Sequence, residues 1–486
     1  MEIELKLEFD PADRERLIAC PLLSARDRTA SRLVATYFDT PGLDLEKAGY
    51  ALRIRTDGST WIQTVKAAPD IAAGLFVRGE WENKLGGDRP VLDAKAGPLN
   101  QLFDQALLGT VAPQFTTDVE RLAGPIERPD GSMIEYAIDS GEVRAGARFH
   151  PLSEIELELK HGSPDALFDL ARMLNEQLPL RLGVQSKSAR GYALAGNRAT
   201  AAVKARPIQL DRDVAVGDGF ATIAVACIRQ YRLNEDLLLR SGGAEPVHQA
   251  RVAIRRLRSA FWLFRPLVEG DDEARTFEAE LRWLAGELGE IRDIDVLLPE
   301  LDGQQRTTLA AMREHRFLHL CNQLDTGRAR RLPIELVEWL STGKWRTDPA
   351  NAEPRDQKLR GFACNRLEKL RKRIKRAGKD LAGVGDAQRH ELRKDAKKLR
   401  YAAEFFVSLY PGRKPRRRID RLFDRLEALQ DRLGELNDRA GAPTLFARLG
   451  IDAALPPLAK KERKRLLEDA EDCFDAFVDC KRFWRD

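Results

Sequence analysis

The sequence has few of the features that mark common classes of enzyme, membrane protein or secreted protein. Its six cysteines form no C-x-x-C pair within 486 residues, which gives no zinc signature and no disulfide framework. The longest run without a charged residue is thirteen residues, 105–117, whereas a membrane-spanning helix needs roughly 20. Neither a Walker sequence nor the G-x-S-x-G of serine hydrolases occurs. Alternating charge in residues 2–6, where a signal peptide would be apolar, favours a cytoplasmic protein without membrane attachment.

Charge is distributed unevenly along the chain. Residues 1–200 hold 24 basic and 30 acidic side chains, and the remainder holds 57 basic and 46 acidic ones. The second part should therefore attract polyanions, whereas the first should not do so by net charge alone. The Ala-rich segment 198–207, which ends in a proline, is the candidate linker. We expect one domain at residues 1–200 and another at residues 208–486.

The two parts also differ in their secondary-structure signals. Before the linker, short stretches alternate charged and apolar residues between Gly, Pro and Asp clusters, a pattern typical of strands. After it, long stretches rich in Leu, Ala, Arg and Glu follow helical spacing, with breaks near residues 242–246, 270, 299 and 412. The sequence predicts an α+β first domain and an all-α second domain.

Several predicted strands of the first domain carry charge on one face. Glu2, Glu4 and Lys6 alternate with apolar residues, so in a strand they point the same way. The same alternation places together Arg53 and Arg55, Thr64 and Lys66, Glu80 and Glu82, and Glu154, Glu156 and Glu158. A solvated sheet face explains any one such strand. Each strand is nearly of one sign, however, and like charges side by side are unfavourable unless opposite charge lies between them.

A metal ion with a phosphate chain would supply that charge. Carboxylates without His or Cys are ligands for Mg²⁺ or Mn²⁺, and Mg²⁺ usually binds together with substrate phosphates. Arg and Lys would hold the remaining phosphate oxygens. If the strands close into an antiparallel β-barrel, these polar faces line its interior and the apolar faces pack against outer helices.

This set of residues resembles the CYTH superfamily, the triphosphate tunnel metalloenzymes, over residues 1–200. The resemblance rests on E-x-E-x-K at residues 2–6, L-R-I-R at 52–55, T-V-K at 64–66, E-W-E at 80–82, Arg121, D-S-G at 139–141, E-x-E-x-E at 154–158, and Lys187. It implies metal ligands among Glu2, Glu4, Glu154, Glu156 and Glu158, and phosphate contacts from Lys6, Arg53, Arg55, Lys66, Arg121 and Lys187. Lys6, Glu80, Glu82 and Asp139 are the expected catalytic residues, the three acids binding a second metal or orienting water.

The resemblance leaves the substrate open. It implies Mg²⁺-dependent hydrolysis of inorganic triphosphate, with hydrolysis of nucleoside or thiamine triphosphate, adenylyl cyclisation, or polyphosphate binding without catalysis as alternatives. Tyr50, Trp61 and Trp81 are candidates for stacking on an organic ring, although aromatic residues in strands more often belong to the core.

The helical part contains an internal repeat. His248, Arg251, Arg255 and Arg258 recur 142 residues later as His390, Arg393, Lys397 and Arg400, each set on one face of a helix. The motif L-G-E-x-x-D at residues 288–293 recurs 145 residues later at 433–438. Matched elements in the same order predict two related helix bundles. We call the two sets of basic residues the basic stripes.

The repeated residues resemble the CHAD domain, a helical module associated with inorganic polyphosphate, over residues 210–486. The resemblance implies polyphosphate contacts from both stripes and from Lys394, with His248 and His390 binding phosphate or positioning their helices. No zinc-finger, helix-turn-helix or RNA-recognition signature occurs, and no aromatic residues interleave the stripes, so nucleic acid is not the expected partner. Asp293, Asp295, Asn437 and Asp438 are expected to brace neighbouring basic residues.

Overall fold

The computed structural model describes residues 2–24, 27–56, 60–67, 73–92, 97–450 and 459–485, without the side chains of 437–442. The chain forms two compact units, which are described separately. The first contains Met1–Val203, Ile228–Ser241 and Asn322–Gly343, and the second contains Lys204–Cys227, Gly242–Cys321 and Lys344–Asp486. Two helical segments from the later part of the chain thus belong to the first unit, which the sequence did not indicate. A domain boundary between residues 200 and 208 stays a prediction.

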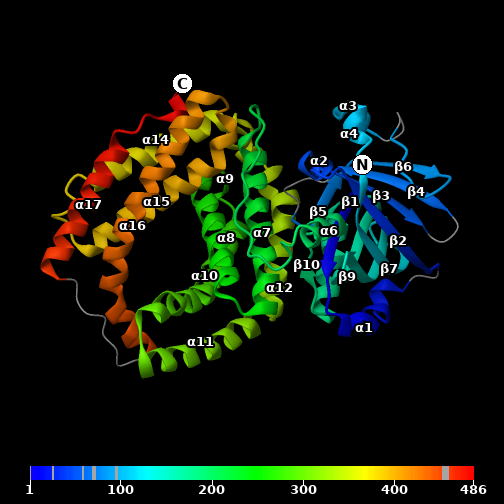
Figure 1. The fold of residues 1–486 in the computed structure, drawn as a ribbon, viewed down its shortest axis with the longest axis horizontal. Coiled ribbons are helices and arrows are strands. Elements are labelled where there is room, and N and C mark those ends of the chain that lie inside the picture. Colours follow the sequence, from blue (N-terminus) through cyan, green and yellow to red (C-terminus); the bar gives the residue numbers. More distant parts are fainter. Residues whose placement is uncertain are drawn as a thin grey trace. The chain divides into compact units, whose positions relative to one another are not determined.

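The first unit is built around one antiparallel sheet (Figure 1). Its strands are β1 Glu2–Glu8, β2 Thr29–Asp39, β3 Tyr50–Thr56, β4 Trp61–Ala67, β5 Leu75–Arg78, β6 Glu80–Leu85, β7 Ala112–Glu127, β8 Met133–Ala145, β9 Arg148–His161 and β10 Arg181–Leu182. Short helices lie in the connections: α1 Arg14–Ile18, α2 Asp44–Lys47, α3 Leu99–Leu102 and α4 Gln105–Leu108. The predicted antiparallel sheet with helices, followed by an all-helical region, is confirmed.

The strand pairings run in a closed circuit. Neighbours follow the order β1-β9-β8-β7-β2-β3-β4-β6, and β5, which precedes β6 in the chain, pairs with β1. Only Gly79 separates β5 from β6. A single segment bent at this glycine therefore joins the two sides of the curled sheet, and the alternate faces of every strand point either into the barrel or out of it.

The outward faces are apolar and covered by a helix. Leu5 and Leu7 of β1 and Ile155 and Leu157 of β9 are fully buried. Helix α5, Asp165–Gln177, contacts both strands and buries its own apolar face against them, and α12 packs on it in turn. This packing fixes the orientation of β1 and β9, so that their charged residues face inward.

One end of the barrel is filled by helix α6, Lys187–Ala195. Its Tyr192 and Leu194 form a cluster with the inward-facing residues of β2, β7 and β8, among them Tyr37 and Phe115. The Tyr37 and Phe115 rings stack with centroids 4.6 Å apart, and Tyr192 meets Phe115 edge to face at 5.0 Å. Gly191 permits this approach, since a Cβ there would lie 2.0 Å from the Phe115 ring. Later residues of α6 therefore occupy this end of the barrel interior.

The helical region begins after an extended segment. Its helices are α7 Val216–Ser241, α8 Ala244–Leu263, α9 Arg265–Val268, α10 Asp272–Leu297, α11 Gly303–Leu324, α12 Gly327–Thr342, α13 Ala352–Asp356, α14 Leu359–Ala377, α15 Asp386–Phe406, α16 Arg413–Leu449 and α17 Lys460–Val478. The four helix breaks predicted from the sequence fall between consecutive helices of this series. No described helix combines the length and the low charge that crossing a bilayer requires.

The internal repeat has a structural counterpart in the second unit. Helix α8 packs on α10, and α15 packs on α16. The stripe residue Arg251 of α8 lies across Gly289 of the first repeated motif, and Arg393 of α15 lies across Gly434 of the second. In both places a guanidinium lies against a glycine of the neighbouring helix, and at Gly434 an added Cβ would lie only 2.9 Å from Arg393 Nη2. The predicted relation between the two segments is therefore visible in their packing.

Candidate active site

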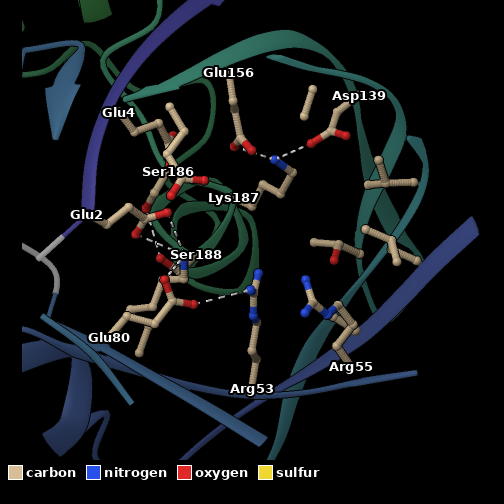
Figure 2. Close-up of a pocket in the computed structure, with 18 of the residues that line it drawn as sticks. Glu2, Glu4, Arg53, Arg55, Glu80, Asp139, Glu156, Ser186, Lys187 and Ser188 are labelled. Atoms are coloured by element: carbon tan, nitrogen blue, oxygen red, sulfur yellow. Dashed lines mark hydrogen bonds and ion pairs between the residues drawn. The ribbon is translucent and has the colours of Figure 1, made fainter. Parts of the chain in front are cut away.

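The barrel encloses a cavity of about 460 Å³ (Figure 2). Thirteen of the fourteen first-domain residues predicted to bind metal or substrate or to act in catalysis line it, and Glu154 lies just behind it. The lining includes eight basic and eight acidic side chains. Such a surface carries almost no net charge, although charges of both signs are packed closely within it.

Strand register places opposite charges beside each other. Lys6 of β1 lies opposite Glu156 of β9, and Lys66 of β4 lies opposite Glu80 of β6. Glu4, by contrast, lies opposite Glu158. The alternation seen in the sequence therefore brings together not only ion pairs but also carboxylates that face each other.

A cluster of buried ion pairs surrounds the start of α6. Lys187, the first residue of α6, has its Nζ 2.7 Å from Asp139 and 2.8 Å from Glu156, and it also pairs with Glu154. Lys6 Nζ lies 2.7 Å from Glu154 and also contacts Glu156. Figure 2 shows Lys187 between Glu156 and Asp139. The positive end of the α6 dipole adds to the attraction for anions at this point.

These contacts shift the ionisation of both partners. Burial opposes the charged form of Lys187, yet the three carboxylates outweigh it and hold its pKa well above the usual value. Burial likewise opposes ionisation of Glu156, but Lys187, Lys6 and Arg121 outweigh it and hold the pKa of Glu156 well below its usual value. Lys187 and Glu156 are therefore both charged at neutral pH.

Arg121 of β7 completes the neutralisation of this cluster. It makes two hydrogen bonds to Asp139, at 2.7 and 2.6 Å, and a third to Glu156 at 2.6 Å. Both oxygens of Asp139 are thus occupied. Asp139, predicted to bind metal or orient water, is placed to hold Arg121 and Lys187 in position.

The opposite wall is formed by β1 and the β3–β6 strands. Arg78 donates to Glu2 at 3.2 Å and to Glu4 at 3.0 Å, while Lys66 lies 2.9 Å from Glu80. Burial and the neighbouring Arg53 and Arg78 lower the pKa of Lys66 in spite of its carboxylate partners. Several cations of this wall therefore lie close to one another, between the acids with which they pair.

Three carboxylates of the site are incompletely paired: two have an oxygen without a hydrogen-bond partner among the described residues, and the third lies close to other acids. Glu4 Oε1 and Glu154 Oε2 are buried and have no hydrogen-bond partner among the described residues, although Glu4 Oε1 lies 3.4 Å from Lys6 Nζ. The pKa of Glu158 is raised, by burial first and also by Glu2 and Glu135, even though Lys160 opposes the shift. A divalent cation would satisfy such oxygens. Oxygens of Asp139, Glu154 and Glu156 lie within 4.8 Å of one another, but two lysines and Arg121 already neutralise them.

Several lining residues were missed in the sequence. These are Tyr37, Arg78, Glu135, Lys160, Ser186 and Ser188. Arg78 lies two residues before Glu80 and Lys160 two after Glu158, so extending the alternation would have identified both. The three candidate stacking residues Tyr50, Trp61 and Trp81 do not line the cavity: Tyr50 and Trp61 pack on the apolar cluster around Leu52, and Trp81 is exposed.

The basic stripes lie on α8 and α15 of the second unit. Burial and neighbouring cations lower the pKa of His248, Arg251 and Arg258. After burial, the largest effect comes from Arg292 on His248, from Arg255 on Arg251 and from Arg282 on Arg258. Arg400 is paired with Glu404 at 3.1 Å. Lys394 is exposed and paired with Glu391 at 2.8 Å, away from the other predicted contacts. In the first stripe, half-buried cations therefore lie close enough to repel one another.

The acids of the repeated motif act as braces where they are described. Asp293 lies 3.1 Å from Arg448 and 3.8 Å from Arg251, and Asp295 lies 2.6 Å from Arg313. The predicted bracing role of both is confirmed. The side chains of Asn437 and Asp438 lie outside the described residues.

Comparisons with known proteins find two families that match successive parts of the chain. The CYTH domain family matches residues 1–192, and the CHAD domain family matches residues 222–447. A protein of Haemophilus influenzae named inorganic triphosphatase is 34% identical over 197 residues, which are 40% of this chain and 54% of the relative. The chain thus matches about half of that relative's length.

Two solved structures resemble parts of the chain. The CHAD domain of the plant Ricinus communis is 26% identical, with a TM-score of 0.45, over 57% of this chain and 91% of its own. A Hippeastrum protein described as an adenylyl cyclase candidate with a dominant triphosphatase activity is 19% identical, with a TM-score of 0.32, over 40% of this chain and 96% of its own. By its two family matches, this chain consists of a CYTH domain followed by a CHAD domain.

Proposed function

We propose that the barrel cavity hydrolyses inorganic triphosphate to diphosphate and phosphate with the help of a divalent metal ion. The observation that carries this proposal is the equal number of acidic and basic side chains in the lining. A phosphate chain alone, or a cation alone, would meet as much repulsion as attraction there. A metal ion bound to a phosphate chain offers charge of both signs at short range. The Haemophilus influenzae relative supports the same reaction.

The cavity lining favours an inorganic substrate over an organic one. Tyr37 is the one aromatic residue in the described lining, and it is already stacked on Phe115. A nucleobase or thiazole ring would therefore find no free aromatic ring to stack on among the described lining residues. Hydrolysis of nucleoside or thiamine triphosphate and adenylyl cyclisation are accordingly the less supported alternatives.

The basic residues of the lining would bind the phosphate chain. Arg53, Arg55, Lys66 and Arg78 come from strands that face the start of α6, so a chain between the two walls would also meet Lys187. In the reaction, water attacks a terminal phosphorus, the bond to the bridging oxygen breaks, and diphosphate leaves with that oxygen. Cations held on both sides stabilise the charge that develops on the transferred and leaving groups.

The acids would take two roles. Glu2, Glu4 and Glu158 fit a hard cation such as Mg²⁺ or Mn²⁺, because Glu4 has an unpartnered oxygen and Glu158 is crowded by other carboxylates. When bound, such a cation neutralises phosphate oxygens and makes the phosphorus more electrophilic. Glu80 and Glu82 remain to orient the attacking water and accept its proton.

In the helical region, the basic stripes would bind polyphosphate. The lowered pKa values of Arg251 and Arg258 indicate cations that repel one another, and a polyanion between them relieves this repulsion. Such binding would hold phosphate polymers close to the chain without any reaction there.

Phosphate release from triphosphate, ATP and thiamine triphosphate, each with Mg²⁺ and with chelator, tests the proposal. We expect Mg²⁺-dependent release that is fastest with triphosphate, and a loss of at least about 100-fold in Glu4→Gln. Glu120→Gln is the matched control, since Glu120 is 73% exposed and does not line the cavity. Equal rates with all three substrates, or full activity in chelator, would contradict the proposal.

A further inference from the structure

A second concave surface lies in the helical region, separate from both basic stripes. It is a cavity of about 960 Å³ between α14, the start of α16 and the chain segment 478–485, which we call the C-terminal basic cavity. Nine of its thirteen lining residues are Lys or Arg and two are acidic. None of the stripe residues contributes to it.

Three elements build this cavity by specific contacts. Arg371 of α14 donates to the carbonyl oxygen of Val478 at 2.7 Å, and Arg418 of α16 donates to that of Arg482 at 3.0 Å. The buried side chains of Phe483 and Trp484 anchor the segment after these carbonyls. The cations from different elements are therefore held together by backbone contacts and by the core, although they repel one another.

One of the two acids of the cavity is shared among several cations. Glu368 accepts a hydrogen bond from Trp484 Nε1 at 3.3 Å and lies 3.3 Å from both Arg482 and Arg485. Burial raises the pKa of Glu368, but Trp484, Arg485, Arg482 and Lys372 outweigh this effect, so one carboxylate faces three cations. Lys372, Lys375 and Lys379 have no carboxylate within ion-pair distance in the described part of the chain, and they follow one another at helical spacing along the cavity.

Arg371 gives an independent sign of a missing ligand. Its side chain is 7% exposed, and its Nη1 is buried with no hydrogen-bond partner among the described residues. Burial, and then the nearby Arg482, lowers its pKa. A buried guanidinium nitrogen without an acceptor is costly unless an anion or water occupies the position it faces.

The helix dipole of α14 alone does not explain why these cations lie around one cavity. Basic residues in the last turn of α14, such as Lys375, stabilise that helix through its dipole and need no ligand. The same explanation does not extend to Arg371 in the middle of α14 or to Arg418 and Arg482, which come from other elements. Convergence of cations from three elements on one cavity is typical of an anion-binding site.

We propose that the C-terminal basic cavity binds a linear chain of phosphates, with Arg371 as its buried anchor and Lys372, Lys375 and Lys379 along its length. A chain ligand matches a cavity that is too large for one phosphate ion. The described lining offers no aromatic side chain for base stacking, which favours a phosphate chain over nucleic acid. The choice of ligand rests on the polyphosphate binding proposed for the helical region, whereas the location rests on the cavity itself.

The test uses the full chain and a linear polyphosphate of uniform length as the probe. Lys372→Ser, Lys375→Ser and Lys379→Ser are combined in one variant, because all three residues are exposed and their loss should not affect folding. The matched control combines Lys460→Ser, Lys461→Ser and Lys464→Ser, three exposed lysines of α17 outside the cavity. Affinity is measured by calorimetry at several salt concentrations, and lysine acetylation with mass spectrometry reports which lysines the ligand protects.

We expect the cavity variant to lose roughly tenfold in affinity, with a shallower dependence on salt, and the control to lose much less. In the unchanged chain, polyphosphate should protect Lys372, Lys375 and Lys379 from acetylation, and protection should persist when Arg255→Ala weakens a stripe. The rate of triphosphate hydrolysis should be the same in the cavity variant and in the control. A lack of hydrolysis in both, and in the unchanged chain, would contradict the proposed enzyme activity but not the C-terminal basic cavity. Unprotected lysines, or equal affinity of the two variants, would overturn the site. Equal protection by single-stranded RNA of matched charge would overturn the ligand class.

Discussion

Replacing Lys187 by methionine would remove the cation on which the buried acids of the barrel most depend. Lys187 contacts Asp139, Glu154 and Glu156, all of which are strongly buried. Breaking a buried ion pair on one side leaves an uncompensated charge and costs about 3–5 kcal/mol. We expect Lys187→Met to lower the free energy of unfolding by that amount at pH 8 in buffer with chelator.

The pH dependence of the free energy of unfolding should change sign in Lys187→Met. In the unchanged chain the pKa of Glu156 lies well below its usual value of 4.5, so its stabilisation is present above that value and is lost as pH falls through the folded-state pKa. Lys187 is the strongest of the charges that lower this pKa. Without Lys187 only Lys6 and Arg121 oppose the effect of burial, so we expect the pKa to rise above its usual value and the variant to lose stability as pH rises, by up to about 1.4 kcal/mol per pH unit.

Urea titration followed by circular dichroism at pH 5 and pH 8 measures both effects. Lys160→Met is the control, because Lys160 pairs with Glu158 and Glu135 at the barrel rim with 44% of its side chain exposed, and such pairs contribute about 1 kcal/mol or less. Mg²⁺ should restore part of the stability of Lys187→Met by supplying positive charge. A loss no larger than that of the control, or a variant more stable at pH 8 than at pH 5, would refute the reasoning.

Two further predictions concern the helical region. Gly434→Ala should weaken polyphosphate binding about three- to tenfold, because its Cβ would lie 2.9 Å from Arg393 Nη2 and displace that guanidinium, whereas Gly286→Ala, with open space around it, should have no effect in the same anisotropy assay. Polyphosphate affinity should rise up to about tenfold per unit as pH falls from 8 to 6, since burial and Arg292 lower the pKa of His248 and a bound polyanion raises it again. This rise should be smaller in His248→Gln, and an identical pH profile in that variant would exclude the histidine from binding.

Much of the barrel site could be predicted because strand alternation is a local property. Glu2, Glu4 and Lys6 lie two residues apart, so their common face follows from backbone geometry alone. Arg78 was missed although it continues the alternation of Glu80 and Glu82, because β5 is short and ends at the bend before β6. Its role depends on pairing with β1, a contact between distant parts of the sequence.

Other features depend on packing that no local pattern encodes. The final part of α7 belongs with the barrel unit through long-range ion pairs: Arg232 lies 3.5 Å from Glu8, and Glu235 lies 3.2 Å from Arg181. The aromatic residues in the strands were candidates either for stacking on a substrate ring or for packing in the core. The structure packs Trp61 against an apolar core cluster. Likewise the C-terminal basic cavity unites cations that are more than a hundred residues apart, such as Arg371 and Arg482.

The helix that fills one end of the barrel divides the barrel interior into a charged part and an apolar part. Helix α6 packs against Phe115 and Tyr37 by its later residues, whereas its first residue, Lys187, lines the cavity. A phosphate chain bound there would meet the positive end of the helix dipole at the boundary between the two parts. One short helix thus supplies both a cation for the substrate and part of the apolar packing that holds this cation in place.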